Sequence, residues 1–300
     1  MASIAILMPG DMGHGVGQAL IAAGHAVHTA LDGRSEHTRQ LASRAGIRDA
    51  GSVDAAVAGA ELVLSILPPD RAEAQAQAVA GAMARTANRP VYVDCNAVSP
   101  MTMRRVAGIM ADAGAPVIDC GIIGLNPVKA PGTRFYVSGP DCAPMLALVC
   151  DAIRVQAVGA EIGRASSLKM VYAALTKGTA ALQTALLLTA LRLDVYDDLI
   201  REFEASQPGP LKAMRDRIPF LPADSGRWAP EMEEIADSFA AVGVPDGFHR
   251  AAAEIYRIMA RTPFAAETRE TLDRERTLEQ ALAGFAAALE RPTEQDPAGA

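Results

Sequence analysis

The sequence predicts an α/β domain with a mostly parallel, doubly wound sheet, followed by an all-α domain. Short apolar runs alternate with helical stretches over roughly the first 160 residues, a pattern typical of a parallel sheet with helices on both faces. After Gly163 the strand signals end, and helical periodicity continues almost to the end of the chain. We therefore expect one domain at residues 1–162 and a helical domain at 163–290, with a disordered polar tail at 291–300.

Composition narrows the classes of function. The chain has 300 residues, which suits two domains, and half of them are apolar. Its net charge is −7, from 28 basic and 35 acidic residues, with no basic stripe. Such a balance argues against nucleic acid or an anionic membrane as a partner, and favours a small-molecule substrate.

The spacing of the cysteines, the N-terminal segment and the longest apolar tract together indicate a soluble cytoplasmic protein without a metal site. The four cysteines have no metal-ligand spacing and are expected to be reduced thiols: Cys95, Cys120, Cys142 and Cys150. Met1–Leu7 has no basic region and is too short for a signal peptide. The longest apolar tract, Thr179–Leu191, is interrupted by Gln183, which favours a buried helix over a membrane span.

The expected elements follow in chain order. The first five strands are expected at Ile4–Met8, Val27–Leu31, Leu62–Leu67, Val91–Asp94 and Val117–Cys120. Two more strands should extend the sheet, at Phe135–Ser138 and Gln156–Val158. Helices between the strands are expected at Arg71–Arg85 and Pro100–Ala113. In the second half, helices are expected at Ala165–Leu193, Tyr196–Ala205, Pro230–Val242, Gly247–Arg261 and Arg269–Ala288. Four prolines predict a loop at Gln207–Arg227, which could be a lid or a plain connection.

The turn after the first strand carries an incomplete glycine fingerprint for a dinucleotide. The G-x-G-x-x-G pattern reads Met8-Pro9-Gly10-Asp11-Met12-Gly13, so Met8 stands where the first glycine normally makes the tight turn. Gly10 would let the backbone approach a pyrophosphate, and Gly13 would let the helix pack closely on the strand. The helix N-terminus would offer N–H groups to the phosphates. Pro9 would make the variant turn rigid.

The end of the second strand bears on the choice between NAD and NADP. Asp32 lies 19 residues after Gly13, where an acidic residue usually accepts bonds from the ribose hydroxyls of NAD. Arg34 and Ser35 follow, and a guanidinium with a hydroxyl can bind the 2′-phosphate of NADP. Gly33 would let the chain turn so that Arg34 and Ser35 cover the ribose. We favour NADP and keep NAD possible.

Two later strand ends supply further candidates, because ligands bind at the carboxyl ends of parallel strands. Leu67 and Pro68 would form a wall under the adenosine, or Pro68 would simply end the strand. Asn96 would bond the nicotinamide ribose or the substrate. The segment Gly121-Ile122-Ile123-Gly124 would form a loop whose backbone N–H groups orient a substrate carboxylate or carbonyl.

Lys169 lies near the start of the long apolar helix. A desolvated lysine has a lowered pKa, which suits general acid/base work near neutral pH. Tyr172 and Thr176 fall on the same helical face. By spacing alone, a lysine that extends to water at a helix start is the simpler interpretation.

Four segments in this order resemble the β-hydroxyacid dehydrogenase family, whose NADP-binding domain is shared with 6-phosphogluconate dehydrogenase. Pro9–Gly13 resembles the family's glycine turn, and Asp94–Pro100 resembles its D-x-S-T-x-S-P segment. Asp119–Gly124 resembles the D-A-P-V-S-G-G substrate loop, and Gly163–Lys169 resembles the G-x-G-x-x-x-K segment. The resemblance implies that Lys169 is the catalytic acid/base. From their positions in the sequence, Asn96 and Tyr172 are expected to assist it.

The chain departs from the family at two polar positions. Ile123 replaces the serine of the substrate loop, and Ala173 replaces the asparagine of K-x-x-x-N. The pocket is therefore expected to be less polar than usual in the family. Gly33-Arg34-Ser35 and Lys169–Ala174 resemble a branch whose helical C-terminal domain has no known function.

In the second half, Trp228 and Glu231 are candidate substrate residues, because the family's corresponding helix reaches the active site. Glu231 and Glu234 lie three residues apart and equally fit a solvated acidic face. For His249, a functional and a purely structural role are likewise both kept as alternatives. The long apolar helix predicts a homodimer through the C-terminal domain.

Together these residues predict an NADP-dependent oxidoreductase that acts on a CH–OH/C=O pair, such as a hydroxy acid or a related carbonyl compound. One alternative is an NADPH-dependent imine reductase, which Tyr172 keeps open although Lys169 argues against it. The other is a protein that binds NADP without turnover.

Overall fold

The computed structural model describes residues 1–289, which fall into two compact units. The first unit comprises Met1–Val171, and the second begins at Tyr172, inside a long helix. The strands of the first unit are β1 (Ser3–Leu7), β2 (Ala26–Thr29), β3 (Arg48–Asp49), β4 (Leu62–Ser65), β5 (Val91–Asp94), β6 (Val117–Ile123), β7 (Thr133–Ser138) and β8 (Ile153–Gly159). Its helices are α1 (Asp11–Ala22), α2 (Glu36–Arg44), α3 (Val53–Ala58), η1 (Pro69–Arg71), α4 (Ala72–Thr86), α5 (Pro100–Asp112) and α6 (Ala143–Leu146).

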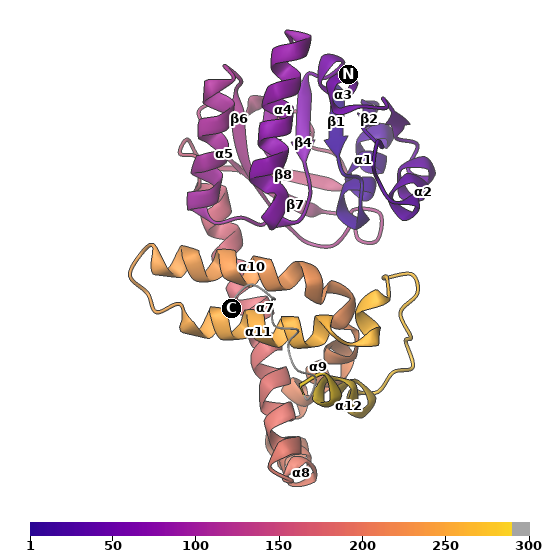
Figure 1. Ribbon diagram of the computed structural model, residues 1–300, viewed down its shortest axis with the longest axis vertical. Coiled ribbons are helices and arrows are strands. Elements are labelled where there is room, and N and C mark those ends of the chain that lie inside the picture. The colour runs from indigo at the N-terminus through magenta and orange to yellow at the C-terminus, as the bar shows by residue number, and fades with distance from the viewer. Residues whose placement is uncertain (290–300) are drawn as a thin grey trace, which may run out of the picture. The chain divides into compact units, whose positions relative to one another are not determined.

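The strands of the first unit form one sheet in the order β3-β2-β1-β4-β5-β6-β7-β8 (Figure 1). β1 to β6 are parallel, β7 runs antiparallel to β6, and β8 is parallel to β7. The chain leaves β1 in one direction through β2 and β3, then returns to build the other half from β4 onward. The predicted doubly wound sheet is thus confirmed, and its order reverses between β1 and β4, where such folds bind ligands.

Alternating residues of the strands build an apolar core on each face of the sheet. In β1, Ile4 and Ile6 join a core cluster with residues of α1, including Val16 and Leu20. Ala5 and Leu7 join the cluster on the other face, which contains the buried residues of α3, α4 and α5. Figure 1 shows α4 and α5 side by side over this second face. Coverage on both faces explains why the strands are continuously apolar.

β6 is longer than the sequence predicts, and this corrects one expectation. Gly121, Ile122 and Ile123 lie in the strand and pair with Tyr136, Phe135 and Arg134 of β7. The expected loop therefore starts only at Gly124, whose φ is +137°. β7 was expected to extend the sheet, and its antiparallel pairing continues β6 four residues beyond Asp119, the last residue of β6 that pairs with β5.

The second unit is helical, as predicted. Helix α7 (Arg164–Arg192) enters it and is followed by α8 (Tyr196–Ser206), α9 (Pro208–Arg217), η2 (Ile218–Phe220), α10 (Pro222–Ala240), α11 (Gly247–Ala260), η3 (Pro263–Ala266) and α12 (Leu278–Leu289). α10 and α11 pack along each other (Figure 1), with Trp228 against Tyr256 and Phe239 against His249. Over residues 1–289, no helix combines the length and apolar character that a membrane crossing requires.

Three predictions about helix boundaries in this unit are wrong. The expected loop Gln207–Arg227 is α9, η2 and the start of α10, because Pro208 and Pro222 occupy first helical positions, where the missing N–H group has no cost. Helix α10 also continues through Pro230, which was expected to begin a helix. The last helix begins at Leu278 rather than Arg269. The expected disordered tail at 291–300 lies outside the described residues.

Candidate cofactor and active site

Met8 adopts the backbone conformation that the missing glycine would supply. Its φ is +61°, in the left-handed region, and its carbonyl oxygen accepts a 2.8 Å hydrogen bond from the Gly10 amide. A Cβ atom at Gly13 would lie 2.8 Å from the Met8 carbonyl oxygen, so only glycine allows this close approach of α1 to the turn. At Gly10 no atom lies within 4 Å of the Cβ position, which leaves the helix N-terminus open. These features fit a dinucleotide pyrophosphate.

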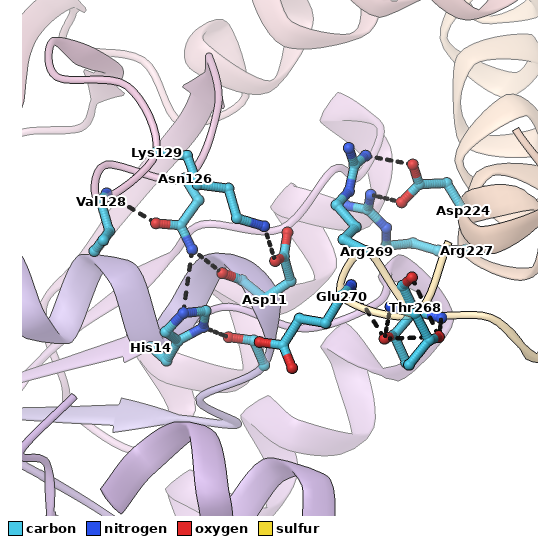
Figure 2. A network of polar contacts seen from close by, with 12 residues as sticks. Asp11, His14, Asn126, Val128, Lys129, Asp224, Arg227, Thr268, Arg269 and Glu270 are labelled. Atoms are coloured by element: carbon cyan, nitrogen blue, oxygen red, sulfur yellow. Dashed lines mark hydrogen bonds and ion pairs between the residues drawn. The ribbon is translucent and has the colours of Figure 1, made fainter. Parts of the chain in front are cut away.

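A loop after β6 is tied to the first turn of α1 (Figure 2). The Asn126 amide donates to the Asp11 carbonyl oxygen and to Nε2 of His14, and its own oxygen accepts from the Val128 amide at 2.9 Å. Nδ1 of His14 bonds the Gly10 carbonyl oxygen at 2.7 Å. Lys129 forms a 3.1 Å ion pair with Asp11. Our sequence reasoning missed these contacts, because they join segments more than 110 residues apart.

The end of β2 leads into a turn that presents Arg34. Gly33 has a φ of +69°, which favours glycine, and the Ser35 hydroxyl caps α2 by accepting from the Thr38 amide at 3.3 Å. Arg34 is partly buried, and its NH1 nitrogen lies 3.5 Å from the Met8 sulfur. Its Nε–H group is buried without a hydrogen-bond partner within the described chain. An unpaired buried donor beside the glycine turn fits an anionic group of the cofactor.

Arg71, at the end of η1, adds a second positive charge near Arg34. Burial lowers the pKa of the Arg34 guanidinium, and the charge of Arg71 lowers it further. Neither arginine forms an ion pair with a carboxylate among residues 1–289. Two like charges held together without an acidic partner favour a doubly charged phosphate.

Asn96 holds the ends of β4 and β5 together. Its side-chain oxygen accepts from the Leu67 amide at 2.7 Å, and its amide group donates to the Ser65 hydroxyl and the Asp94 carboxylate at 3.1 and 3.0 Å. Asn96 is 3% exposed, and both of its amide hydrogens are used in these bonds. The structure therefore gives Asn96 a role in shaping the turn at Leu67 and Pro68, and its predicted contact with cofactor or substrate stays a prediction.

Lys169 reaches the end of β6. Its ammonium group donates to the Ile122 carbonyl oxygen at 2.6 Å. A Cβ at Gly121 would lie 2.9 Å from both the Ala165 carbonyl oxygen and the Lys169 Cβ, so the glycine permits direct contact between strand and helix. Ile122 and Ile123 are buried, at 7% and 4% exposure. The structure thus brings together two of the segments that were predicted to form the site, the end of β6 and the start of α7.

The start of α7 is bonded to Asp119, a buried carboxylate of β6. This residue accepts hydrogen bonds from the Gly163 and Ser166 amides and from the hydroxyls of Ser138 and Ser166. Burial raises the pKa of the Asp119 carboxyl, against the opposing effect of these hydrogen bonds. Sequence reasoning used Asp119 only as the first residue of a motif.

Two candidates of the second unit, Trp228 and Glu231, belong to one polar cluster of that unit. Glu231 is 3% exposed and pairs with Lys177, which is 7% exposed and lies 5.5 Å from the Trp228 ring centroid. Nearby, Asp224 pairs with Arg227 and Arg269 (Figure 2). Glu231 is therefore buried and does not belong to a solvated acidic face. The Tyr172 side chain, in contrast to Glu231, is 47% exposed. The predicted substrate contacts of Tyr172, Trp228 and Glu231 stay predictions.

The four cysteines are free thiols. In the described part of the chain, no group of three or more histidine, cysteine, aspartate and glutamate side chains could hold a metal ion.

Family models match both parts of the chain. Residues 3–147 match the NAD binding domain of 6-phosphogluconate dehydrogenase, and residues 190–259 match a domain of unknown function, DUF1932. The 3-hydroxyisobutyrate dehydrogenase of Pseudomonas aeruginosa is 32% identical over 142 residues, which are 47% of this chain and 47% of that protein. The chain thus aligns with about half the length of this relative.

Solved structures extend the likeness to the whole fold. The 3-hydroxyisobutyrate dehydrogenase of Mycobacterium tuberculosis with L-serine matches with a TM-score of 0.63 and 20% identity, over 97% of this chain and 100% of that chain. An imine reductase of Streptomyces aurantiacus matches with a TM-score of 0.53 and 18% identity, over 90% and 98%. Residues 3–147 therefore form an NAD-binding domain of the 6-phosphogluconate dehydrogenase type, residues 190–259 match DUF1932, and these matches support a nicotinamide-dependent dehydrogenase or reductase.

Proposed function

We propose that the protein is an NADP-dependent oxidoreductase that acts on a CH–OH/C=O pair, with Lys169 as its acid/base. The observation that carries this proposal is the position of the Lys169 ammonium group, 2.6 Å from the Ile122 carbonyl oxygen at the carboxyl end of β6. A parallel sheet of this order binds its ligand at that edge. A proton donor fixed there is within reach of a substrate beside the nicotinamide.

When bound, the nicotinamide cofactor supplies a hydride to the substrate carbon or accepts one from it. Lys169 would donate a proton to the carbonyl oxygen during reduction and take one from the hydroxyl during oxidation. Pro9 to Gly13 would hold the pyrophosphate at the N-terminus of α1, and Leu67 with Pro68 would line the adenosine side. The Gly121–Gly124 backbone would orient the substrate.

The preference for NADP over NAD rests on Arg34 and its surroundings. The buried Nε–H of Arg34 without a partner in residues 1–289, the nearby charge of Arg71, and Ser35 at the start of α2 all favour a phosphate. Asp32 lies exposed in the turn after β2, where an acidic residue can bind the ribose hydroxyls of NAD, so NAD stays the alternative.

The substrate is proposed to be a hydroxy acid or a related carbonyl compound that is less polar than 3-hydroxyisobutyrate or glycerate. Ile123 is 4% exposed at the β6 end, and Ala173 is 2% exposed one turn after Lys169. Neither side chain can bond a substrate hydroxyl, so an apolar substituent should be preferred.

An assay of NADPH oxidation against a panel of substrates tests this proposal. The panel contains aldehyde acids, ketones, 2-oxo and 3-oxo acids and cyclic imines, with NADH in parallel. Turnover of carbonyl compounds with NADPH supports the proposal, whereas turnover of imines alone identifies the alternative that the likeness to an imine reductase and Tyr172 keep open. NADPH binding without any turnover would identify the third alternative, a non-catalytic binding protein.

We further propose a homodimer formed through α7. Leu168, Leu175 and Leu182 recur every seven residues and are 40%, 72% and 51% exposed, and Val171 between them is 62% exposed. An apolar stripe of this length on one helix favours a helical partner. Light scattering at micromolar concentration should give a dimer, and Leu175→Glu a monomer; a monomeric parent would contradict the proposal. A cytoplasmic location stays a prediction.

A further inference from the structure

We propose that Asp119 is a positioning residue for Lys169: its carboxylate holds the first turn of α7 against β6, so that the lysine one turn later reaches the end of the strand. The inference rests on the proposed function of Lys169. It concerns a buried charge that would otherwise have no role in the chemistry.

The carboxylate replaces the usual cap of the helix. Its Oδ2 atom accepts from the Gly163 amide at 2.9 Å, the Ser166 amide at 3.0 Å and the Ser138 hydroxyl at 3.0 Å. Its Oδ1 atom accepts from the Ser166 hydroxyl at 2.6 Å. The Ser138 oxygen accepts in turn from the Ala165 amide at 3.0 Å. Three backbone N–H groups at the helix start are therefore satisfied by β6 and β7, and not by a local side chain.

Two further contacts show why these bonds determine where Lys169 lies. Asp119 and Gly121 are two residues apart on β6 and so face the same side. Asp119 binds Ser166, and Gly121 lies against Ala165 and Lys169, which is three residues and about one helical turn after Ser166. The helix is thus held to the strand at Asp119 and pressed on it at Gly121. This register brings the Lys169 ammonium to the Ile122 carbonyl.

A purely stabilising role for Asp119 is the simpler alternative. Asp119 is fully buried, and burying a carboxylate costs free energy that an apolar residue of similar size would avoid. The carboxylate fixes the position of the first turn of α7, which an apolar residue could not do, because its two oxygens bind four donors at once, from the helix start and from β7. The two roles predict different behaviour of variants that are equally destabilised.

Two substitutions at Asp119 separate position from charge. In Asp119→Asn, the side-chain oxygen can keep the three bonds at the Oδ2 position while the amide donates to the rotated Ser166 hydroxyl. Asp119→Ala removes every bond. We expect Asp119→Ala to lower kcat by roughly 10- to 100-fold with the Kd for NADPH within a few-fold, and Asp119→Asn to recover most of kcat. Val57→Ala, a core variant of α3, is the control for lost stability and should keep kcat.

Hydrogen exchange gives a readout that does not depend on activity. In Asp119→Ala, amide exchange at residues 163–169 should rise by at least about tenfold over the parent, and less so in Asp119→Asn. Should Asp119→Ala fail to fold, Ser166→Ala removes only the hydroxyl bond and should give a smaller change of the same kind.

The outcomes distinguish this inference from the proposed function. If Lys169→Ala loses turnover while Asp119→Ala keeps kcat, the positioning role is overturned and the function of Lys169 stands. If Asp119→Asn is as impaired as Asp119→Ala, charge matters and position does not, which also overturns the inference. If Lys169→Ala keeps turnover, the proposed function fails, and unchanged exchange at 163–169 in Asp119→Ala then overturns the placement as well.

Discussion

The ammonium group of Lys169 donates a 2.6 Å hydrogen bond to the carbonyl oxygen of Ile122. This contact joins the start of α7 to the carboxyl end of β6, 47 residues away in the sequence. It places a proton donor where β6 ends, at the same edge of the sheet as the carboxyl ends of β1 and β4, which lead into the glycine turn and Leu67. The proposed acid/base chemistry depends on this contact.

Met8→Gly should stabilise the protein. Met8 has a φ of +61°, and a non-glycine residue in the left-handed region is strained by about 1–2 kcal/mol. Part of that gain is lost to the greater flexibility of glycine in the unfolded chain, so we expect a net gain of about 0.5–1 kcal/mol. Urea denaturation measures it. Ala87→Gly, at a second left-handed position with a φ of +55°, should behave similarly, and a clear loss of stability in Met8→Gly would show that the side chain contributes more than the strain.

Gly121→Ala should lower both stability and kcat. The new Cβ would meet the Ala165 carbonyl oxygen and the Lys169 Cβ at 2.9 Å, so helix and strand must separate. Overpacking of this kind costs about 1–3 kcal/mol, and a shift near 1 Å at the reacting groups can cost about 100-fold in rate. Gly108→Ala is the matched control, because Gly108 lies on the exposed face of α5 and its Cβ position has no neighbour within 4 Å. That variant should gain up to about 1 kcal/mol and keep kcat.

Arg34→Ala should weaken NADPH binding selectively. A charge-assisted bond to the 2′-phosphate contributes about 1.5–3 kcal/mol, so the Kd for NADPH should rise roughly 10- to 100-fold while that for NADH changes little. Arg71→Ala should have a smaller effect in the same direction. Arg44→Ala, in the last turn of α2, removes the same charge and controls for general electrostatics. Equal losses for NADPH and NADH in Arg34→Ala would contradict the assignment.

His249 should make stability fall at acidic pH. Burial between Phe239 and Phe248 lowers the pKa of His249, with Asp246 opposing the shift. Below pH 6.5, the ordinary pKa of histidine, the unfolded chain binds a proton at His249 more readily than the folded protein does. The free energy of unfolding therefore decreases as the pH falls from 6.5 toward the lowered pKa of His249 in the folded protein. In urea titrations, the parent should lose more stability than His249→Leu between pH 7.5 and pH 5. Parallel losses in the two proteins would contradict this role.

Much of the fold could be predicted because local signals agree with it. The strand positions, the glycine turn and the long helix all follow from periodicity and from residues such as Gly13 and Gly33, whose conformations the structure requires. The capping of α12 could also have been found: Thr277 and Gln280 bond each other's backbone amides, which is the reciprocal capping pattern. The predicted start at Arg269 overlooks this pattern and lies nine residues too early.

The remainder depends on contacts between distant segments. Asp119 binds the start of α7 across 44 residues, and Asn126 binds Asp11 across 115, so no local pattern reveals either. Asn96 shows the same limit, since its position at a strand end suggests a ligand, while its bonds to Leu67, Ser65 and Asp94 could not be read from the sequence. The sequence predicts which side chains lie at a strand end, but it does not predict which groups these side chains bond.

The most direct test of the central claim is the turnover of Lys169→Ala. With the best carbonyl substrate of the panel, single-turnover NADPH oxidation should be slower than in the parent by about 10²–10⁴-fold, because a positioned acid/base contributes that much. The Kd for NADPH should be unchanged. Lys212→Ala, which removes an exposed lysine of α9, should match the parent in both measurements. A rate for Lys169→Ala within a few-fold of the parent would contradict the assignment of Lys169 as the acid/base.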